Sequence, residues 1–230
     1  MNSDSPGSMF TDSQTRLQDR FDTRRLADVI ERNIVAPTVS DEWAAFIERL
    51  DMVFVASVDA EGRPACSYKG GDPGFVRVLR PDLLAFPLYD GNGLFVTAGN
   101  MAETGLVELL FVEFERPQRL RVGGLARVAD PEAGDLALWP EARLVVRVAV
   151  QHCYVNCKRY VHRHVRAEPS PYVPRASAET PVAAWKLLPY VEPHLAAADR
   201  EEIARRRAEG LPLPEPEGTG PRAIEGEDPQ

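Results

Sequence analysis

Residues 52–69, MVFVASVDAEGRPACSYK, decide how this chain folds. The run Met52–Val58 is continuously apolar and rich in β-branched residues, which is typical of a strand. It is followed by DAEG at residues 59–62 and by a second extended segment, Arg63–Lys69. Because Asp and Gly favour tight reversals of the chain, the stretch predicts an antiparallel β-hairpin.

The strand pattern continues for roughly a hundred residues beyond the first strand. Short turns rich in Gly and Pro separate further extended segments at residues 75–79, 82–88, 106–114, 119–129 and 143–150. Strands joined by short turns, without regular helices between them, favour an antiparallel sheet over a doubly wound parallel one. The sequence therefore predicts a mainly β protein, with six or seven antiparallel strands closing into a barrel and helices at its flanks.

Helical patterns flank the predicted barrel. The segment SDEWAAFIERL, residues 40–50, begins with an N-cap serine and two acids and spaces its apolar residues at helical intervals. Weaker helical patterns occupy residues 24–34, 94–101, 152–165 and 199–208. We divide the chain into a flexible N-terminus (1–12), N-terminal helices (13–50), the barrel and its following helix (51–165), a C-terminal arm and helix (166–208) and a disordered, acidic, Pro-rich tail (209–230).

Composition and charge exclude several classes of protein. The chain has 230 residues, of which 44% are hydrophobic and 27% charged, and this is the balance of a globular protein. Its net charge is −8, and the segment Glu209–Gln230 carries six acids against Arg222, so five of the eight charges lie there. The nearly neutral body argues against nucleic-acid binding. The chain has only three cysteines, which favours a cytoplasmic protein, and it has no long apolar span, which argues against membrane association.

A glycine-rich turn is the first candidate for a binding site. Asp90-Gly91-Asn92-Gly93 follows a predicted strand and precedes a short helical pattern. It matches neither the dinucleotide nor the P-loop fingerprint. Glycines still allow close approach of the backbone, and helix N-terminal amides attract anions, so the segment could hold one phosphate. A plain tight turn is the alternative.

Three segments, in this order, resemble flavin-binding proteins of the pyridoxamine 5′-phosphate oxidase-like superfamily. They are RPACSYKGG at residues 63–71, FPLYDGNG at 86–93 and RLRVGG at 119–124. The likeness spans about Val53 to Tyr160, and VNCKRY at 155–160 resembles the uncharacterised flavin-nucleotide-binding branch. The resemblance implies a split β-barrel that dimerises and holds FMN at the subunit interface.

The same resemblance implies the contacts of the cofactor. They are Ala65, Cys66, Ser67, Tyr68 and Lys69 beside the flavin ring, Asp90, Asn92 and Gly93 at the phosphate turn, and Arg119 as a polar flavin contact. A cation such as Lys69 near the N1 and O2 edge of the flavin would stabilise the charge of the reduced ring. For Lys69, a solvated charge at a strand end is the alternative.

The resemblance implies an FMN-dependent oxidoreductase that transfers hydride at flavin N5 to or from a small substrate. Vitamin B6 oxidation is not supported, because residues 166–170 and Trp185-Lys186 lack the substrate-phosphate and terminal patterns of the true oxidase. The alternative is a non-catalytic protein of the same fold that binds or sequesters a flavin or haem. The sequence leaves the catalytic residues, the substrate and the electron donor open.

A second constellation lies in the predicted helix at 152–165. There Cys153 and Cys157 would be one turn apart and could share a soft metal with His162, although two small buried hydrophobes describe the cysteines equally well. The basic residues at 158–166 are either a solvated helix face or an anion clamp with Arg159 or Arg163 as the contact. We include no metal in the expected site.

Overall fold

The computed structural model describes residues 8–215 of the chain. The chain divides into two compact units, Met1–Glu168 and Pro169–Gln230. Parts of the expected flexible N-terminus and of the expected acidic tail, residues 1–7 and 216–230, lie outside the described residues.

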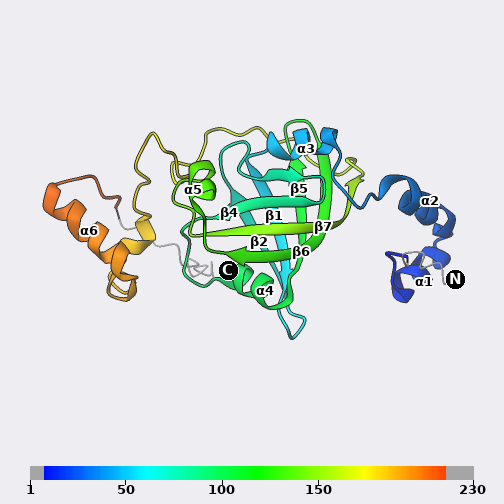
Figure 1. Cartoon of the computed structure of the whole chain (residues 1–230), viewed down its shortest axis with the longest axis horizontal. Helices are drawn as coiled ribbons and strands as arrows, with labels where there is room; N and C mark the ends of the chain where they lie inside the picture. Colours follow the sequence, from blue (N-terminus) through cyan, green and yellow to red (C-terminus); the bar gives the residue numbers. More distant parts are fainter. Residues whose placement is uncertain (1–7, 216–230) are drawn as a thin grey trace, which may run out of the picture. The chain divides into compact units, whose positions relative to one another are not determined.

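The first unit contains the strand-rich part of the chain (Figure 1). Its strands are β1 (Met52–Val58), β2 (Pro64–Gly70), β3 (Arg77–Arg80), β4 (Leu83–Leu88), β5 (Leu106–Glu113), β6 (Gln118–Ala129) and β7 (Leu144–Asn156). Its helices are α1 (Asp12–Arg20), α2 (Arg24–Ile34), α3 (Asp41–Glu48), α4 (Val96–Thr104) and α5 (Ala133–Leu138). The expected helix at 40–50 is confirmed as α3, whose N-cap Ser40 side chain accepts a hydrogen bond from the Trp43 N–H.

All seven strands form one antiparallel sheet in the order β2-β1-β5-β6-β7-β4-β3. The predicted hairpin is β1 and β2, in which Phe54 lies opposite Tyr68. Within residues 8–215 the edge strands β2 and β3 do not pair with each other, so the sheet surrounds a core without closing completely. The mainly β, antiparallel architecture expected from the sequence is confirmed.

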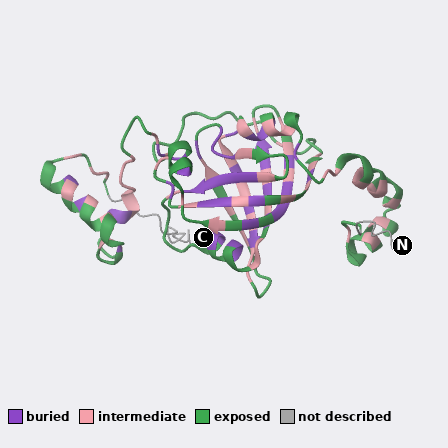
Figure 2. Ribbon diagram, viewed as in Figure 1, coloured by how far each residue is buried: buried purple, intermediate pink, exposed green. Residues whose placement is uncertain are grey.

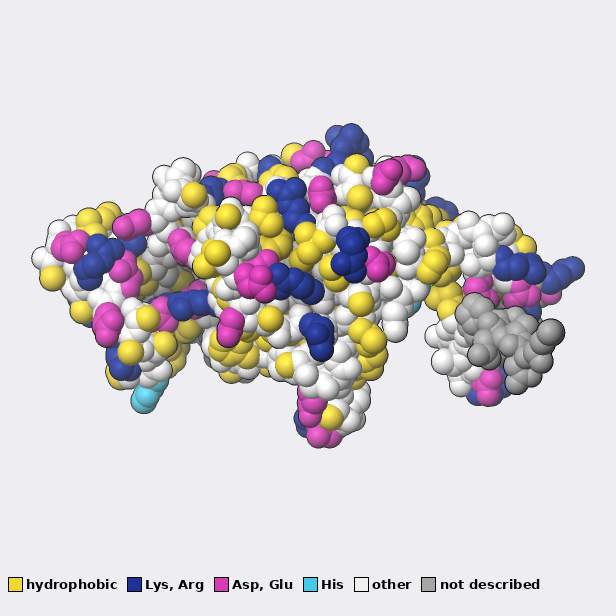
Figure 3. Space-filling model, in the orientation of Figure 1, with side chains coloured by type: hydrophobic (Ala, Val, Ile, Leu, Met, Phe, Trp, Pro, Cys, Tyr) yellow, Lys and Arg dark blue, Asp and Glu magenta, His cyan; other side chains and the backbone are white. Residues whose placement is uncertain are grey.

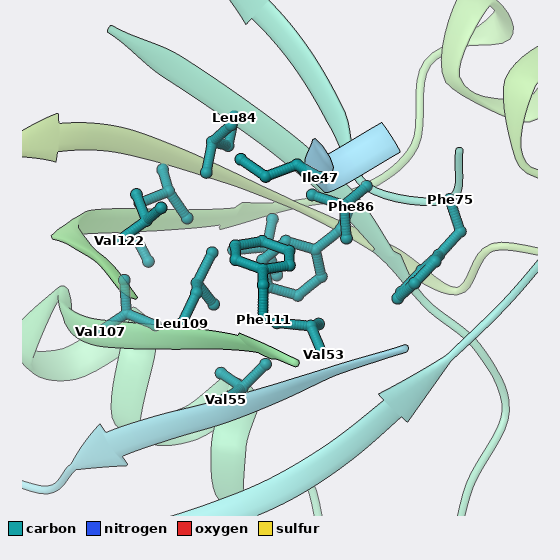
Figure 4. Packing of buried hydrophobic residues seen from close by; sticks show 14 of the residues in the cluster. Ile47, Val53, Val55, Phe75, Leu84, Phe86, Val107, Leu109, Phe111 and Val122 are labelled. Atoms are coloured by element: carbon teal, nitrogen blue, oxygen red, sulfur yellow. The ribbon is translucent and has the colours of Figure 1, made fainter. Parts of the chain in front are cut away.

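One side of the sheet encloses the hydrophobic core (Figures 2 and 4). Alternate residues along each strand point inward, as Val53 and Val55 do on β1 and Leu109 and Phe111 do on β5, and all four are fully buried. Burial of side chains of this size contributes about 1.5–3 kcal/mol each. The core therefore fixes which face of every strand is inside.

The prediction of a helix at residues 152–165 is wrong. Strand β7 continues to Asn156, which lies opposite Arg119 of β6, and residues 157–168 contain no helix. A register shift at Gly123/Gly124 lets the long β6 remain paired with β7 beyond the irregularity. The backbone hydrogen bonds of this ladder outweigh the weak helical spacing of the side chains, as tertiary context often does.

The second unit is a small helical assembly. It contains η1 (Ala184–Leu187), η2 (Glu192–His194) and α6 (Ala197–Glu209), and α6 confirms the expected helix at 199–208. Leu187, Leu195 and Ile203 form its buried core. No helix among residues 8–215 is long and apolar enough to cross a membrane.

Candidate functional site

The five candidate residues of β2 lie on two opposite faces of the sheet. Ala65, Ser67 and Lys69 are partly buried, whereas Cys66 and Tyr68 are exposed on the other face. This follows from the two-residue period of a strand. Within one chain, a ligand on the inner face of the sheet can therefore contact the side chains of Ala65, Ser67 and Lys69 but not those of Cys66 and Tyr68.

A hydrogen bond joins this inner face of β2 to the segment after the glycine-rich turn. The hydroxyls of Ser67 and Thr97 lie 2.6 Å apart, and Thr97 is in the first turn of α4. One turn later the Asn100 side-chain amide donates to the Ser57 hydroxyl of β1 at 3.1 Å. These bonds hold α4 against β1 and β2, so the structure brings the predicted ring-binding strand to the helix that follows the predicted phosphate turn.

The start of α4 has the properties of an anion site. Its N-cap residue, Phe95, makes no side-chain cap, and the first turn contains no acidic residue. The first N–H groups of a helix have no intrahelical acceptor, and the helix dipole places positive charge there. Before the helix, the Asn92 side-chain oxygen accepts the Leu94 N–H at 3.1 Å, and Gly93 adopts a φ of 75°. The turn is thus set by its own residues and leaves the helix amides uncapped.

Lys69 is a half-buried cation with no partner in the part of the chain that the structure describes. Burial lowers the pKa of its ammonium group, and no hydrogen bond or ion pair joins it to another of the described residues. Desolvating a charge without compensation is unfavourable. An anion or acceptor supplied by a ligand would relieve this penalty.

Two of the predicted contacts already have partners within the chain. Arg119 is on β6, so β1 and β5 separate it from β2 by roughly 14 Å, and its guanidinium donates to the Cys157 carbonyl. Asp90 forms an ion pair with Arg143 at 3.6 Å. The structure therefore brings Ser67 to Thr97 of α4 and places Lys69 on the same face of β2 as Ser67, and it does not bring Arg119 to them within one chain.

A groove of about 800 Å³ adjoins the start of α4 and contains residues that sequence reasoning missed. Its lining includes Arg63 of the β1–β2 turn and Leu94, Phe95 and Val96 at the start of α4. In Figure 1 the β1–β2 turn projects beyond the sheet beside α4, and Figure 3 shows charged side chains at the tip of this projection. The unbroken apolar run after a glycine-rich turn was the signal available in the sequence, because such turns are usually polar.

The two cysteines of the predicted helix lie in different surroundings. Cys153 is buried in β7, where its thiol donates to the Thr38 carbonyl at 3.0 Å and burial raises its pKa to about 11. Cys157 is exposed, and hydrogen bonds from the backbone and side chain of Arg159 lower the pKa of its thiol. Among residues 8–215 no three His, Cys, Asp or Glu side chains are grouped as metal ligands.

The basic segment at 158–166 is extended rather than helical. Arg166 forms an ion pair with Asp51, and the His164 ring packs edge-on against Phe114 at 5.3 Å between centroids. Arg159 Nε donates to the Cys157 sulfur at 3.1 Å. The predicted helix face is therefore absent, and part of the segment is held against the ends of the strands.

Comparisons with known proteins place the strand-rich part of the chain in a family. Residues 39–157, which are more than half of the chain, match the family model described as pyridoxamine 5′-phosphate oxidase. No protein of curated function matches the chain.

Solved structures with a similar fold cover about half of the chain. HupZ of Group A Streptococcus is 20% identical, with coverage of 55% of this chain and 99% of that chain and a TM-score of 0.42. HutZ, the heme storage protein of Vibrio cholerae, is 17% identical, with coverage of 51% and 94% and a TM-score of 0.39. An F420 reductase is 15% identical, with coverage of 51% and 98% and a TM-score of 0.37. On the match of the family model, this chain belongs to the pyridoxamine 5′-phosphate oxidase family.

Proposed function

We propose that this chain binds FMN and acts as an oxidoreductase on a small substrate. The observation that carries the proposal is Lys69, a half-buried cation with no partner among residues 8–215. It lies on the same face of β2 as Ser67, which is bonded to the start of α4. The Lys69 ammonium and the uncapped amides of α4 both lack a partner of opposite polarity. A ligand with a polar ring edge and an anionic end would supply both, because the ring edge compensates the ammonium and the anion compensates the helix amides.

The residues present fit such a mononucleotide. The uncapped amides of Val96, Thr97 and Ala98 would hold its phosphate, and Gly93 permits close approach of the preceding turn. The first turn of α4 contributes no Lys or Arg, so the backbone carries most of this interaction. Ala65, Ser67 and Lys69 would border the ring.

When bound, FMN supplies hydride chemistry at its N5 atom. The chain contributes orientation and charge. The Lys69 ammonium would stabilise negative charge at the N1 and O2 edge and raise the tendency of the cofactor to be reduced. The Ser67 hydroxyl, held by Thr97, would fix the position of that edge.

We further propose that the protein is a cytoplasmic homodimer with no nucleic-acid or membrane partner. The outer face of the sheet exposes Tyr68, Leu106 and Leu125, which are 60%, 49% and 43% exposed. Arg119 alternates along β6 with the buried Leu120 and Val122, so it lies on the same outer face. A second copy packed there would cover these apolar residues.

The absorption spectrum of the purified protein tests the cofactor directly. We expect flavin bands, stoichiometric FMN after reconstitution and bleaching by NADH or NADPH. A Soret band would indicate that the protein binds haem instead of flavin, and it would favour the non-catalytic binding role. A colourless protein that FMN does not reconstitute would contradict the proposal.

Variants of the chain's lysines test the site. Lys69→Met should weaken FMN binding about ten- to a hundredfold, since a charge-assisted hydrogen bond contributes about 1.5–3 kcal/mol. Lys158→Met, which removes an exposed lysine, is the matched control and should bind FMN as the wild type does. Equal FMN affinities of the two variants would show that Lys69 does not contact the cofactor.

A further inference from the structure

The first two helices of the chain expose their apolar side chains. Helix α1 has nine residues and α2 has eleven, and neither contains a buried residue (Figure 2). On α2, Leu26, Val29 and Ile34 are 59%, 48% and 36% exposed. Helices of this length are marginal in water by themselves, because most helix stability in proteins comes from packing of an amphipathic face. The pair of helices therefore requires a surface that covers this face.

The apolar side chains of α2 follow one line along the helix. Leu26, Ile30 and Ile34 are spaced four residues apart, so they form a ridge on one side. Ile30, in the middle of the ridge, is only partly buried, and Val29 lies beside it. We define Leu26, Val29, Ile30 and Ile34 as the apolar ridge. A contiguous apolar patch of this kind marks an interaction surface more often than inert surface.

Polar contacts hold α1 to α2 on another side of the helix. Glu31 accepts a hydrogen bond from the Met9 N–H at 2.5 Å, and Arg24 forms an ion pair with Asp19 at 2.7 Å. Successive residues of a helix are turned by about 100° around its axis, so Glu31 and Arg24 both lie roughly a quarter to a third of a turn from the middle of the ridge. The contacts within the pair of helices therefore leave the ridge uncovered.

The chain that follows α2 is fixed to the sheet. Ala36 and Cys153 of β7 exchange both backbone hydrogen bonds, at 2.9 Å and 2.8 Å, and the Val39 N–H donates to the Pro81 carbonyl at 2.8 Å. A single residue separates the end of α2 from Ala36. The C-terminal end of α2 is thus anchored at β7. A surface anchored in this way loses less conformational entropy when a partner binds to it than a free segment would.

Charge and composition favour a second copy of the chain as the occupant. Between residues 12 and 34 five arginines balance five acidic residues. A helix that lies on a membrane surface usually carries an excess of Lys and Arg, whereas balanced charge lets identical surfaces approach without repulsion. Residues 1–7 and 216–230 contain only two large apolar residues, Met1 and Ile224, which are too few to cover the ridge.

The exposed apolar area is sufficient for a contact between two copies. At the end of α1, Leu17 and Phe21 are 54% and 66% exposed. With about 200 Å² for a fully exposed side chain of this size, the five exposed apolar side chains of α1 and α2 present roughly 500 Å² in one copy. Two copies together bury roughly 1,000 Å², which is the lower limit for a specific protein interface.

We propose that α2 is a self-association surface on which the apolar ridge of one copy packs antiparallel against the same ridge of a second copy. Ridges formed by every fourth residue interdigitate when two helices cross. A two-fold axis near Ile30 would set Leu26 of one copy opposite the partner's Ile34. This contact goes beyond the proposed function, because it requires no FMN and is separate from the contact at the outer face of the sheet.

Analytical ultracentrifugation of the full-length protein tests the association. Leu26→Gln/Val29→Gln makes the ridge polar, and since glutamine is a good helix former, far-UV circular dichroism should show that α2 is retained. Leu138→Gln, which replaces an exposed leucine at the end of α5, is the matched control. We expect the double variant to raise the concentration of half-association about a hundredfold or more, and the control to associate as the wild type does.

Disulfide cross-linking tests whether the two ridges face each other. The background Cys66→Ser/Cys157→Ser removes the exposed cysteines. The three ridge variants are Leu26→Cys, Ile30→Cys and Ile34→Cys. Arg32→Cys, at an exposed position on the opposite side of α2 from Ile30, is the control. With copper phenanthroline as oxidant, one thiol of each copy gives up a proton and an electron, and the two sulfurs form one S–S bond.

We expect a cross-linked dimer for at least one ridge variant and none for Arg32→Cys. The absorption spectrum of the same samples reports FMN separately. A cross-linked dimer of a protein that binds no FMN would therefore support this proposal while the proposed function fails.

Three results would overturn the proposal. A monomeric wild type, or equal association of the wild type and Leu26→Gln/Val29→Gln, would show that the ridge joins no copies. Cross-linking of all three ridge variants at the level of Arg32→Cys would show that the ridges do not meet. Flotation of the wild type, but not of the double variant, with vesicles of phosphatidylcholine and phosphatidylglycerol would assign the ridge to a membrane surface.

Discussion

The hydroxyl groups of Ser67 on β2 and Thr97 on α4 lie 2.6 Å apart. Thr97 is buried and Ser67 is partly buried, so each hydroxyl depends on the other as a partner shielded from water. This bond is the point at which the strand and the turn of the candidate site meet. Its loss should therefore affect both stability and binding.

Replacement of Thr97 by valine keeps the shape of the side chain and removes its hydrogen bond. We expect the free energy of unfolding to fall by about 1–3 kcal/mol, because the Ser67 hydroxyl is left without its partner. The double variant Ser67→Ala/Thr97→Val should lose less than the sum of the two single variants. Urea unfolding measures all three, and additive losses would show that the hydroxyls do not interact.

Lys69 should make stability depend on pH in the alkaline range. Burial lowers its pKa in the folded chain below the ordinary value of about 10.4. Between the two pKa values the unfolded chain binds more protons than the folded chain, so the free energy of unfolding rises with pH. Lys69→Met lacks this contribution. We therefore expect the free energy of unfolding of the wild type, relative to that of Lys69→Met, to increase when urea unfolding is measured at about pH 8 and then at about pH 10.5. A difference between the two proteins that does not depend on pH would mean that Lys69 is solvated.

Gly93 and Gly62 form a matched pair that separates strain from binding. Their φ values are 75° and 81°, and an added Cβ would meet no atom within 4 Å at either position. Valine at either site should cost about 1–2 kcal/mol of stability, since a β-branched residue disfavours positive φ. Only Gly93→Val should also weaken FMN binding. Equal FMN affinities of the two variants, measured by fluorescence titration, would contradict the assignment of the phosphate turn.

Gly123 and Gly124 of β6 should respond differently to alanine. A Cβ at Gly124 would overlap the Ala149 backbone carbonyl, which cannot move without disturbing the ladder. A Cβ at Gly123 would overlap the ends of the Glu108 and His152 side chains, which meet across that glycine at 3.1 Å. We expect a loss of about 3 kcal/mol or more for Gly124→Ala and about 1 kcal/mol for Gly123→Ala.

Thermal or urea unfolding of these two variants gives the measurement. Similar losses would show that the sheet relaxes around Gly124. A larger loss for Gly123→Ala would mean that the bond between Glu108 and His152 stabilises the fold more than the close approach of the strands does.

The strand pattern was predictable because burial alternates along strands that face a core on one side. Val53 and Val55 on β1 follow this alternation, and the DAEG turn between β1 and β2 has the residues that a reversal requires. The N-cap serine and helical spacing of α3 were equally local signals. Each of these features depends on neighbours within a few residues.

The error at residues 152–165 has the opposite cause. Cys153 and Cys157 have a spacing that fits a helix, yet Cys153 lies in β7 opposite Val122. Whether such a segment is a helix or a strand depends on whether a partner strand is available. That partner, β6, lies more than twenty residues earlier in the chain.

The sequence alone determined the hairpins, the antiparallel class of the sheet and the glycine-rich turn, because local spacing and turn residues carry that information. Only the tertiary structure decided that Ser67 and Lys69 share a face with α4, that Arg119 lies two strands beyond β1, and that Phe95 faces a groove. These relationships depend on the register between strands and on how α4 packs against the sheet. Both are set by the burial of side chains from the whole first unit.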